Sequence, residues 1–246
     1  IFSFFFFSQI LLSQNLIQNP DFENYSSCPS GQSQMSSLNN WNIYTETPDH
    51  CNSCNYTGSL GAGIASSGNG YVSFFPYYRF TQVGGPFNIP LWTEPLSETF
   101  ESTLINPLST CSTYRLEFDI RCRQCPSNNP LVGAYFYSSS GPAPNIVSGS
   151  NGLDYVNETP QASINGNTIT STYQRASITF TPTSNFDKIL VGSFPGGTPI
   201  ANGSADVFTS HPYYSIDNMS LVAISSVVSA PTTATASPST ICSGSS

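Results

Sequence analysis

Charged residues are scarce in this chain. Of its 246 residues 8% are charged, and 6 basic against 14 acidic residues give a net charge of −8. Nucleic acids and anionic membrane surfaces are bound through clustered lysine and arginine side chains. Here Lys188 is the one lysine and the arginines are scattered along the sequence, which argues against both kinds of partner.

Catalytic motifs are lacking as well. There are 2 histidines, and no G-x-S-x-G, H-E-x-x-H or phosphate-binding glycine loop occurs. Carboxylate pairs such as Glu98 with Glu101, or Glu117 with Asp119, have the chemistry of a glycosidase. Glu117 and Asp119 fit better as the solvent-facing side of one strand, so we predict that the chain is not an enzyme.

No segment shows a sustained helical period. The chain instead has 13% aromatic residues, 18 Gly and 19 Pro, which is typical of short strands joined by polar loops. In residues 114–121 (YRLEFDIR) every second position is charged and the others are apolar, as in a half-buried antiparallel strand. Further strands are expected at 41–44, 71–75, 98–105, 131–137, 175–181, 189–194 and 213–224. We predict an all-β, antiparallel jelly-roll β-sandwich.

Three other segments are interpreted as less regular. Residues 16–23 read as a first strand interrupted by Asn19-Pro20, and residues 49–54 and 76–95 are expected to be loops. In the last strand, 213–224, the apolar phase slips by one residue at Asp217, which indicates a β-bulge.

The two ends of the chain differ in composition from its middle. Residues 1–13 (IFSFFFFSQILLS) form an apolar run of signal-peptide length that is too short for a transmembrane helix. We therefore expect export to the cell surface or medium, with residues 14–224 as the mature domain and no membrane insertion of it. Residues 225–246 are rich in Ser, Thr and Ala and are expected to be a linker into a following domain.

Seven cysteines fit an oxidising compartment. Two C-x-x-C pairs have the spacing of a four-cysteine zinc site, but the apparent export signal favours disulfides. We expect Cys28 to pair with Cys51 or Cys54, which lie in the same third of the chain. The disulfide candidates are Cys28, Cys51, Cys54, Cys111, Cys122 and Cys125.

Two segments together carry a family likeness. Residues 15–23 (NLIQNPDFE), followed by Trp41, resemble the opening of galactose-binding-like jelly-roll modules of the carbohydrate-binding kind, and residues 213–221 (YYSIDNMSL) resemble their closing strand. Residues 26–32, 47–49, 68–71 and 191–194 look like a variant found in exported proteins of gliding, Bacteroidetes-type bacteria. Residues 237–245 resemble the first strand of the Ig-like repeats in the surface adhesins of such bacteria.

The resemblance implies a structural Ca²⁺ between the first and last strands. The matching ligands in this chain are Glu23 and Asp217, with Asp21 as a weaker candidate. Ca²⁺ takes six to eight oxygen ligands, including carboxylates, and a bulge at Asp217 would free backbone carbonyls. The alternative is that Asp217 caps a turn and Glu23 is solvated.

Ligand binding is predicted for the segment expected to be a long loop. Sugars stack on aromatic faces and hydrogen-bond to planar polar groups, and this segment offers Tyr77, Tyr78, Arg79 and Trp92. The alternative is that these aromatic residues fill the core beneath the loop. We therefore expect a non-catalytic N-terminal binding module of a large surface adhesin that contacts glycans or other surface polymers. The alternative function is a structural cap that contacts protein at the tip of an Ig-repeat stalk.

Overall fold

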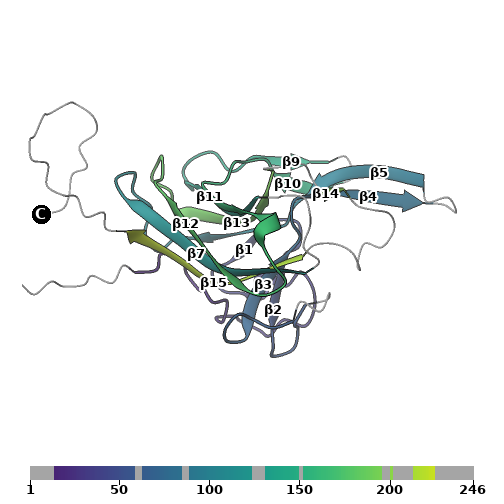
Figure 1. Ribbon diagram of the computed structural model, residues 1–246, viewed down its shortest axis with the longest axis horizontal. Helices are drawn as coiled ribbons and strands as arrows, with labels where there is room; N and C mark the ends of the chain where they lie inside the picture. The colour runs from purple at the N-terminus through teal and green to yellow at the C-terminus, as the bar shows by residue number, and fades with distance from the viewer. Residues whose placement is uncertain are drawn as a thin grey trace, which may run out of the picture.

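Two antiparallel sheets of five strands each face one another in the computed structural model (Figure 1). The structure describes residues 14–58, 63–84, 89–123, 131–149, 152–195, 200–201 and 213–224. Sheet I has the order β1 (Asn42–Thr45), β6 (Thr99–Thr103), β13 (Lys188–Phe194), β8 (Leu131–Tyr137) and β11 (Ala162–Asn165). Sheet II has the order β12 (Gln174–Phe180), β7 (Thr113–Arg123), β15 (Tyr213–Ile224), β3 (Gly70–Phe74) and β2 (Asp49–Asn52). The all-β, antiparallel jelly-roll sandwich predicted from the sequence is confirmed.

Smaller elements surround the sandwich. A hairpin joins β9 (Ile146–Ser148) to β10 (Asp154–Val156), and a separate sheet has the order β14 (Ile200–Ala201), β4 (Tyr78–Gly84) and β5 (Ile89–Leu96). The helices in the described part of the chain are two 3-10 turns, η1 (Met35–Ser37) and η2 (Gly166–Thr168). Neither has the length that crossing a membrane requires.

The core lies between the two sheets and is rich in aromatic rings. Along β7 the alternation predicted from the sequence is observed, with Leu116, Phe118 and Ile120 fully buried. The Trp41 ring lies 5.4 Å from the Phe22 ring and 5.2 Å from the Phe100 ring, measured between centroids. Rings at these distances pack edge to face or tilted, which adds to the gain from burial.

The opening segment is not the strand that the sequence suggested. Asn19 and Phe22 have positive φ angles of 47° and 56°, and Pro20 has no N–H to donate, so the segment turns instead of pairing continuously. It still bonds to the last strand, because Leu16 N donates to Leu221 O at 2.9 Å and Met219 N donates to Pro20 O at 2.8 Å. The prediction of a first strand at residues 16–23 is therefore wrong. The segment nevertheless lies beside β15, as these hydrogen bonds show.

The bulge predicted in the last strand is present. Asp217 of β15 pairs with Asp119 of β7, and the next paired residue, Ser220, lies opposite Glu117. Asn218 has a φ of 48°, the left-handed conformation that such an irregularity uses.

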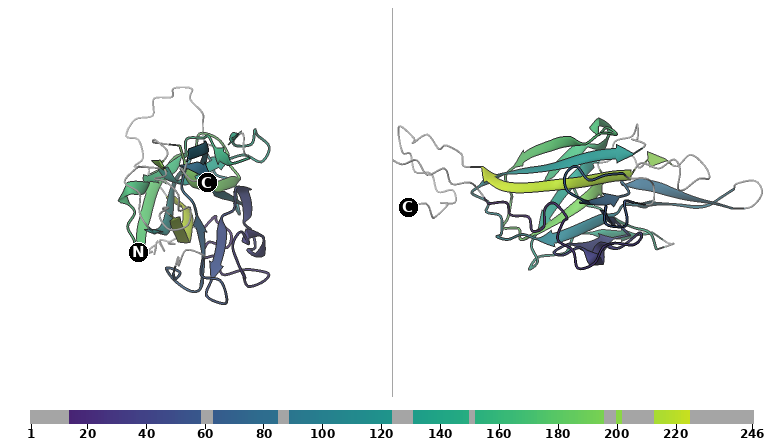
Figure 2. Two further views of the ribbon diagram at one scale, coloured as in Figure 1. Left: turned by 90° about the vertical axis from the view of Figure 1, so that its right-hand side faces the viewer. Right: turned by 90° about the horizontal axis from the view of Figure 1, so that it is seen from below.

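Two segments expected to be loops are strands. Residues 49–52 form β2, all four of them buried, and residues 78–96 include the hairpin of β4 and β5, which we call the ribbon. Figures 1 and 2 show the ribbon extending beyond the end of the sandwich. Pro90 and Pro95 suggested a loop, but β5 is an edge strand, and an edge strand tolerates proline.

Gly133 marks a close approach of β8 and β11 in sheet I. A Cβ atom built on Gly133 of β8 would lie 2.0 Å from the carbonyl oxygen of Ala162 in β11. The clash is with backbone, which cannot move aside as a flexible side chain can. Gly133 is therefore required for β11 to pair at its observed distance.

We predict that Gly133→Ala lowers the free energy of unfolding by about 1–3 kcal/mol, the usual cost of overpacking, when measured by urea denaturation. Gly31→Ala is the matched control, because a Cβ there would meet its nearest neighbour at 3.7 Å, an ordinary contact. Equal stability of the two variants would contradict the assignment.

Candidate functional site

The outer face of sheet I carries a cluster that we call the tyrosine face and define as Tyr44, Tyr135, Tyr137, Glu101 and Lys188. Cross-strand pairing places four of these residues on one side of the sheet, because Lys188 pairs with Tyr137 and Leu190 pairs with both Tyr135 and Glu101. Tyr44 joins them through its ring contact with Tyr137. The intervening positions of β8 and β13, such as Phe136 and Val191, belong to the core between the sheets. Alternation along each strand thus sends the tyrosines outward.

A small apolar layer supports the tyrosine face. Leu190 and Phe194 of β13 and Val156 of β10 are fully buried and form a cluster with Tyr137, separate from the main core. Tyr44 and Tyr135 are half-buried and pack against this cluster. Tyr44 and Tyr135 are therefore held by buried neighbours while part of each ring remains accessible, whereas Tyr137 is itself buried.

Hydrogen bonds and ring contacts hold the tyrosines in place. The Tyr137 ring lies 6.3 Å from that of Tyr44 and 6.4 Å from that of Tyr135. The Tyr137 hydroxyl donates to Glu101, whose other oxygen lies 3.6 Å from Lys188 Nζ. The Tyr44 hydroxyl donates to the carbonyl of Pro144 at 3.0 Å. Half-buried aromatic rings beside ion-paired polar groups are the chemistry that recognises a ligand with both apolar and hydroxyl surfaces.

Burial and nearby carboxylates keep the phenols protonated. Burial, with the charges of Glu101 and Glu158, raises the pKa of Tyr44 to about 12. Burial and the bond to Glu101 raise the pKa of Tyr137, and burial and Glu158 raise that of Tyr135. The three hydroxyl groups therefore remain neutral. Those of Tyr44 and Tyr137 already donate their one proton, to the Pro144 carbonyl and to Glu101, and so present oxygen lone pairs to a ligand.

Sequence reasoning missed the tyrosine face although its signal is present. Tyr135 and Tyr137 are two residues apart in a correctly predicted strand, and Tyr44 lies in another. A period-of-two reading puts Tyr135 and Tyr137 on one face, but only the strand order shows that Tyr44 joins them.

The predicted ligand residues lie on or beside the ribbon. Tyr77, just before β4, is 8% exposed, and its ring lies 5.1 Å from that of Tyr155. Tyr78 and Arg79 belong to β4 and Trp92 to β5, while the surroundings of their side chains are outside the described part. Ligand binding by these four residues stays a prediction.

Glu23 and Asp217, the predicted metal ligands, hold the same loop. Asp217 is fully buried, and one of its oxygens accepts hydrogen bonds from the amides of Ser66 and Ser67 at 2.8 and 3.0 Å. One oxygen of Glu23 accepts from the amides of Asn69 and Gly70. The structure therefore brings the two carboxylates to opposite ends of residues 66–70, a connection that the sequence did not show.

Asp217 also faces a second acid. Burial and the charge of Asp119 raise the pKa of Asp217 to about 6, against the opposing effect of its amide hydrogen bonds. For Asp119, burial acts in the same upward direction, but bonds from Ser66, Asn218 and Arg175 hold its pKa below the usual value. A buried carboxylate with an acidic neighbour is an environment that a bound cation would stabilise.

The oxygen donors here have the chemistry of a Ca²⁺ site, although they are few. The carbonyl of Phe22 lies against Gly70, where an added Cβ would be 2.3 Å from it, so a backbone oxygen lies near Glu23. In the described ranges no group of three or more His, Cys, Asp or Glu side chains is placed to hold a metal ion. Calcium would need backbone carbonyls or water besides Glu23 and Asp217, and it stays a prediction.

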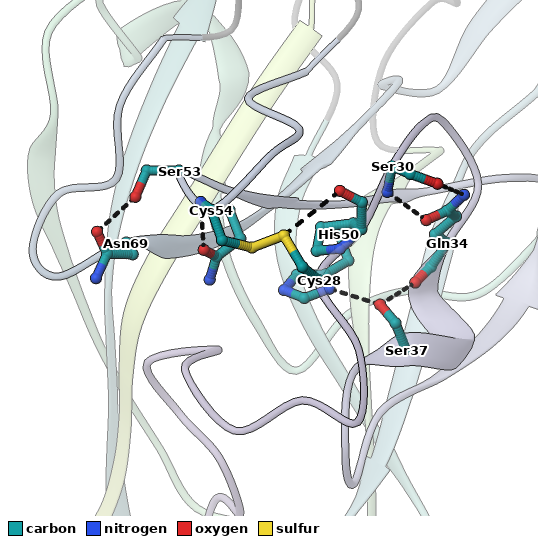
Figure 3. The surroundings of a disulfide bond; sticks show 10 residues. Cys28, Ser30, Gln34, Ser37, His50, Ser53, Cys54 and Asn69 are labelled. Carbon is teal, nitrogen blue, oxygen red and sulfur yellow. Dashed lines mark hydrogen bonds between the residues drawn. A yellow bond between two sulfur atoms is a disulfide. The ribbon is translucent and has the colours of Figure 1, made fainter.

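Cys28 is bonded to Cys54, as one of the two predicted pairings had it (Figure 3). Because Cys54 is in a disulfide, it is excluded from a four-cysteine zinc site.

Cys111 is also disulfide-bonded. Cys51 and Cys122 are buried thiols, and Cys125 lies outside the described residues. Burial raises the pKa of Cys51 to about 12, which makes it unreactive.

A buried serine–histidine pair beside the disulfide does not form a catalytic dyad. Ser37 Oγ lies 2.8 Å from His50 Nδ1, and the same hydroxyl donates to the carbonyl of Gln34 at 2.7 Å (Figure 3). The one hydroxyl proton is thus shared between the Gln34 carbonyl and the histidine, and the pair is buried. His50 is fully buried, and burial lowers its pKa to about 4.

Glu98 is a buried carboxylate whose pKa is raised well above its ordinary value. It is 3% exposed, accepts a hydrogen bond from Phe75 N at 2.7 Å and another from the Thr47 hydroxyl at 3.2 Å. Burial, together with the charges of Asp49 and Glu46, raises its pKa to about 8. Because it is buried and held by these bonds, it lacks the access that a glycosidase carboxylate needs.

Comparisons with known proteins give structural neighbours. No protein-family model matches the chain, and no curated protein matches it. The K3 cleaved adhesin domain of Lys-gingipain from Porphyromonas gingivalis is 16% identical, with a TM-score of 0.39 over 85% of this chain and 98% of that one. The family 11 carbohydrate-binding module from Clostridium thermocellum, in complex with a mixed-linked tetrasaccharide, is 14% identical, with a TM-score of 0.36 over 85% and 94%.

A third neighbour is the CBM22-1 xylan-binding domain from Paenibacillus barcinonensis, which is 9% identical, with a TM-score of 0.37 over 82% of this chain and 90% of that one. The assignment of the fold rests on the strand order of this chain itself.

If calcium binds at Glu23 and Asp217, EDTA will lower the melting temperature of the wild-type chain and will have little effect on Asp217→Asn or Glu23→Gln. Glu117→Gln, which removes a carboxylate paired with Arg115 and Arg175, is the control and should keep the EDTA response. Thermal unfolding followed by circular dichroism, with and without EDTA, measures the melting temperature of each variant. An EDTA shift of equal size in wild type and both variants, or no shift in wild type, would overturn the calcium prediction.

The raised pKa of Glu98 predicts a loss of stability on the alkaline side. The folded chain keeps this proton up to a pKa of about 8, whereas the unfolded chain releases it near its ordinary value, so between the two the folded state binds more protons and stability falls as pH rises. Unfolding free energies at about pH 6.5 and about pH 8.5 should show this fall. The opposite contribution of His50, whose pKa is lowered from 6.5 on folding, is common to the wild type and to Glu98→Gln and cancels when the two are compared.

Glu98→Gln should flatten that fall, because the glutamine has no proton to lose. Glu117→Gln, on the outer face of β7, controls for the removal of one negative charge. An unchanged fall in Glu98→Gln would show that another group causes it.

Proposed function

We propose that this chain is a non-catalytic binding module that contacts glycans or similar polymers through the tyrosine face. The observation that carries the proposal is the set of three tyrosines on the outer side of sheet I, held by a buried apolar layer and flanked by the Glu101–Lys188 pair. Sugar rings present apolar faces with hydroxyl groups around them, and fixed phenol rings with neutral hydroxyls complement both.

The outer face of sheet II is less suited to this role. Its row on β7 and β12 is charged, with Arg175 bonded to Asp119 at 3.1 Å and close to Glu117 at 3.9 Å. These groups satisfy one another, and their aromatic neighbour, Tyr173, packs under the guanidinium of Arg121 at 4.9 Å. The outer side of sheet II is therefore charged along β7 and β12, whereas at β2 and β3 its aromatic residues Tyr71 and Tyr213 are buried in a cluster of their own.

We propose further that the module is exported and belongs to a surface adhesin, as the resemblance described above implies. The Cys28–Cys54 disulfide supports an oxidising compartment. The segments that suggested a signal peptide and an Ig-like repeat, residues 1–13 and 225–246, lie outside the described residues. A structural cap that contacts protein remains the second candidate, supported by the ribbon that extends from the sandwich.

Binding to a glycan array, followed by titration of the best neutral polysaccharide, tests the proposed function. Tyr44→Ala and Tyr135→Ala should each weaken binding by roughly fivefold, because an aromatic contact contributes about 1 kcal/mol. Tyr173→Ala, which removes a tyrosine beside sheet II, should leave the affinity unchanged. Absence of binding by the wild-type chain to every glycan would favour the structural cap, and equal losses in all three variants would contradict the site.

A further inference from the structure

Basic residues are unevenly distributed between the two sheets. Three arginines belong to β7 and one to β12, both of which are strands of sheet II. In the five strands of sheet I, Lys188 is the one basic residue. Its ammonium lies 3.6 Å from Glu101, so a carboxylate of the tyrosine face already balances it.

Glu158 is a half-buried carboxylate beside the tyrosine face. It accepts a hydrogen bond from the amide of Asn145 at 2.9 Å, and the carbonyl of the preceding residue, Pro144, accepts one from the Tyr44 hydroxyl at 3.0 Å. The carboxylate and the Tyr44 ring are therefore held by neighbouring residues of one segment. Burial is the largest cause of the raised pKa of Tyr44 and of Tyr135, and the charge of Glu158 contributes to both.

No basic side chain forms an ion pair with Glu158 in the described part of the chain. The ion pairs there are made by two arginines of sheet II and by Lys188, and Glu158 takes part in none of them. A third carboxylate, Asp187, immediately precedes β13, and its amide donates to the carbonyl of Tyr137 at 3.1 Å. With three carboxylates against one ammonium, the tyrosine face carries an excess of negative charge.

Carboxylates beside phenol rings favour a cationic ligand group. An ammonium is attracted to the face of an aromatic ring, and its hydrogen bond to a carboxylate is stronger than one between neutral groups. An anionic ligand would be repelled by the same carboxylates. Glu158 can therefore separate ligands by their charge, which tyrosines with neutral hydroxyl groups cannot do.

We propose that the tyrosine face selects glycans that carry free amino groups, with a sugar ammonium bound to Glu158 beside the rings of Tyr44 and Tyr135. This inference rests on the proposed function. Glu158 is the specificity-determining residue, whereas the rings contribute to the affinity for any sugar. A glucosamine polymer has protonated amines where its N-acetylated form has neutral amides, so the two polymers differ at the group that Glu158 binds.

The experiment compares three tetrasaccharides that differ in charge, those of glucosamine, N-acetylglucosamine and galacturonic acid. Calorimetric titrations at about pH 6 keep the amines protonated. We expect the wild type to bind the glucosamine tetrasaccharide about tenfold or more tightly than the acetylated one, equivalent to about 1.4 kcal/mol, and to bind that of galacturonic acid most weakly. Raising the salt concentration to about 1 M, where the screening length is about 3 Å, should reduce this preference.

Glu158→Gln should lose the preference and keep the affinity for the acetylated tetrasaccharide, because glutamine retains an oxygen that can accept from the amide of Asn145. Glu117→Gln, which removes one negative charge from the outer side of sheet II, is the matched control and should keep the preference.

The possible outcomes separate this inference from the proposed function. Equal affinity for the glucosamine and acetylated tetrasaccharides, or a preference that survives Glu158→Gln, would overturn the role of Glu158 and leave the proposed function in place. Binding of other glycans but of none of these three would likewise overturn only the role of Glu158. Absence of binding to the three probes and to the glycan array would overturn both proposals. Binding of tetralysine as tightly as of the glucosamine tetrasaccharide, with the same loss in Glu158→Gln, would overturn the selection of amino sugars in favour of a basic protein partner.

Discussion

The closure of the sandwich depends on the buried carboxylate of Asp217. It lies at the register shift of β15, where the ladder with β7 is interrupted, and its two oxygens accept the amide hydrogens of Ser66, Ser67 and Asn218. Because backbone amides buried without a partner are costly, this one side chain allows residues 66–67 to lie against the irregular part of the sheet. Glu23 does the same for residues 69–70, so the opening segment, the loop and the last strand are fixed relative to one another.

The same region joins the ends of the domain. The side-chain amide of Asn15 donates to the carbonyl of Met219 at 3.0 Å, and its oxygen accepts from Leu221 N at 2.9 Å. These bonds supply partners to backbone groups that the bulge removes from the regular ladder. The irregular strand is thus satisfied by side chains from distant parts of the sequence.

Much of the sandwich could be predicted from the sequence, since alternation along β7 is a local property. The bulge at Asp217 was also predictable, because the phase of the apolar residues changes there. The ribbon was not, because Pro90 and Pro95 are typical of loops and only the edge position of β5 makes them compatible with a strand. The tyrosine face could not be found in full, because the pairing of Tyr137 with Lys188, and the position of Tyr44 beside them, depend on the order of strands far apart in sequence. Likewise, Glu23 and Asp217 were predicted to bind one metal ion together. That both carboxylates accept hydrogen bonds from the amides of residues 66–70 could not be predicted, because nothing in the sequence of this loop indicates its partners.

The hydrogen bonds between the opening segment and β15 also determine the direction in which the module faces. β15 ends toward one end of the sandwich, where Leu16 bonds to Leu221, and the ribbon extends from the opposite end (Figure 1). A module held by either terminus would therefore direct its ribbon away from the point of attachment. The strand order alone therefore separates the ribbon from the end at which β15 leaves the sandwich, and no hinge is needed for this.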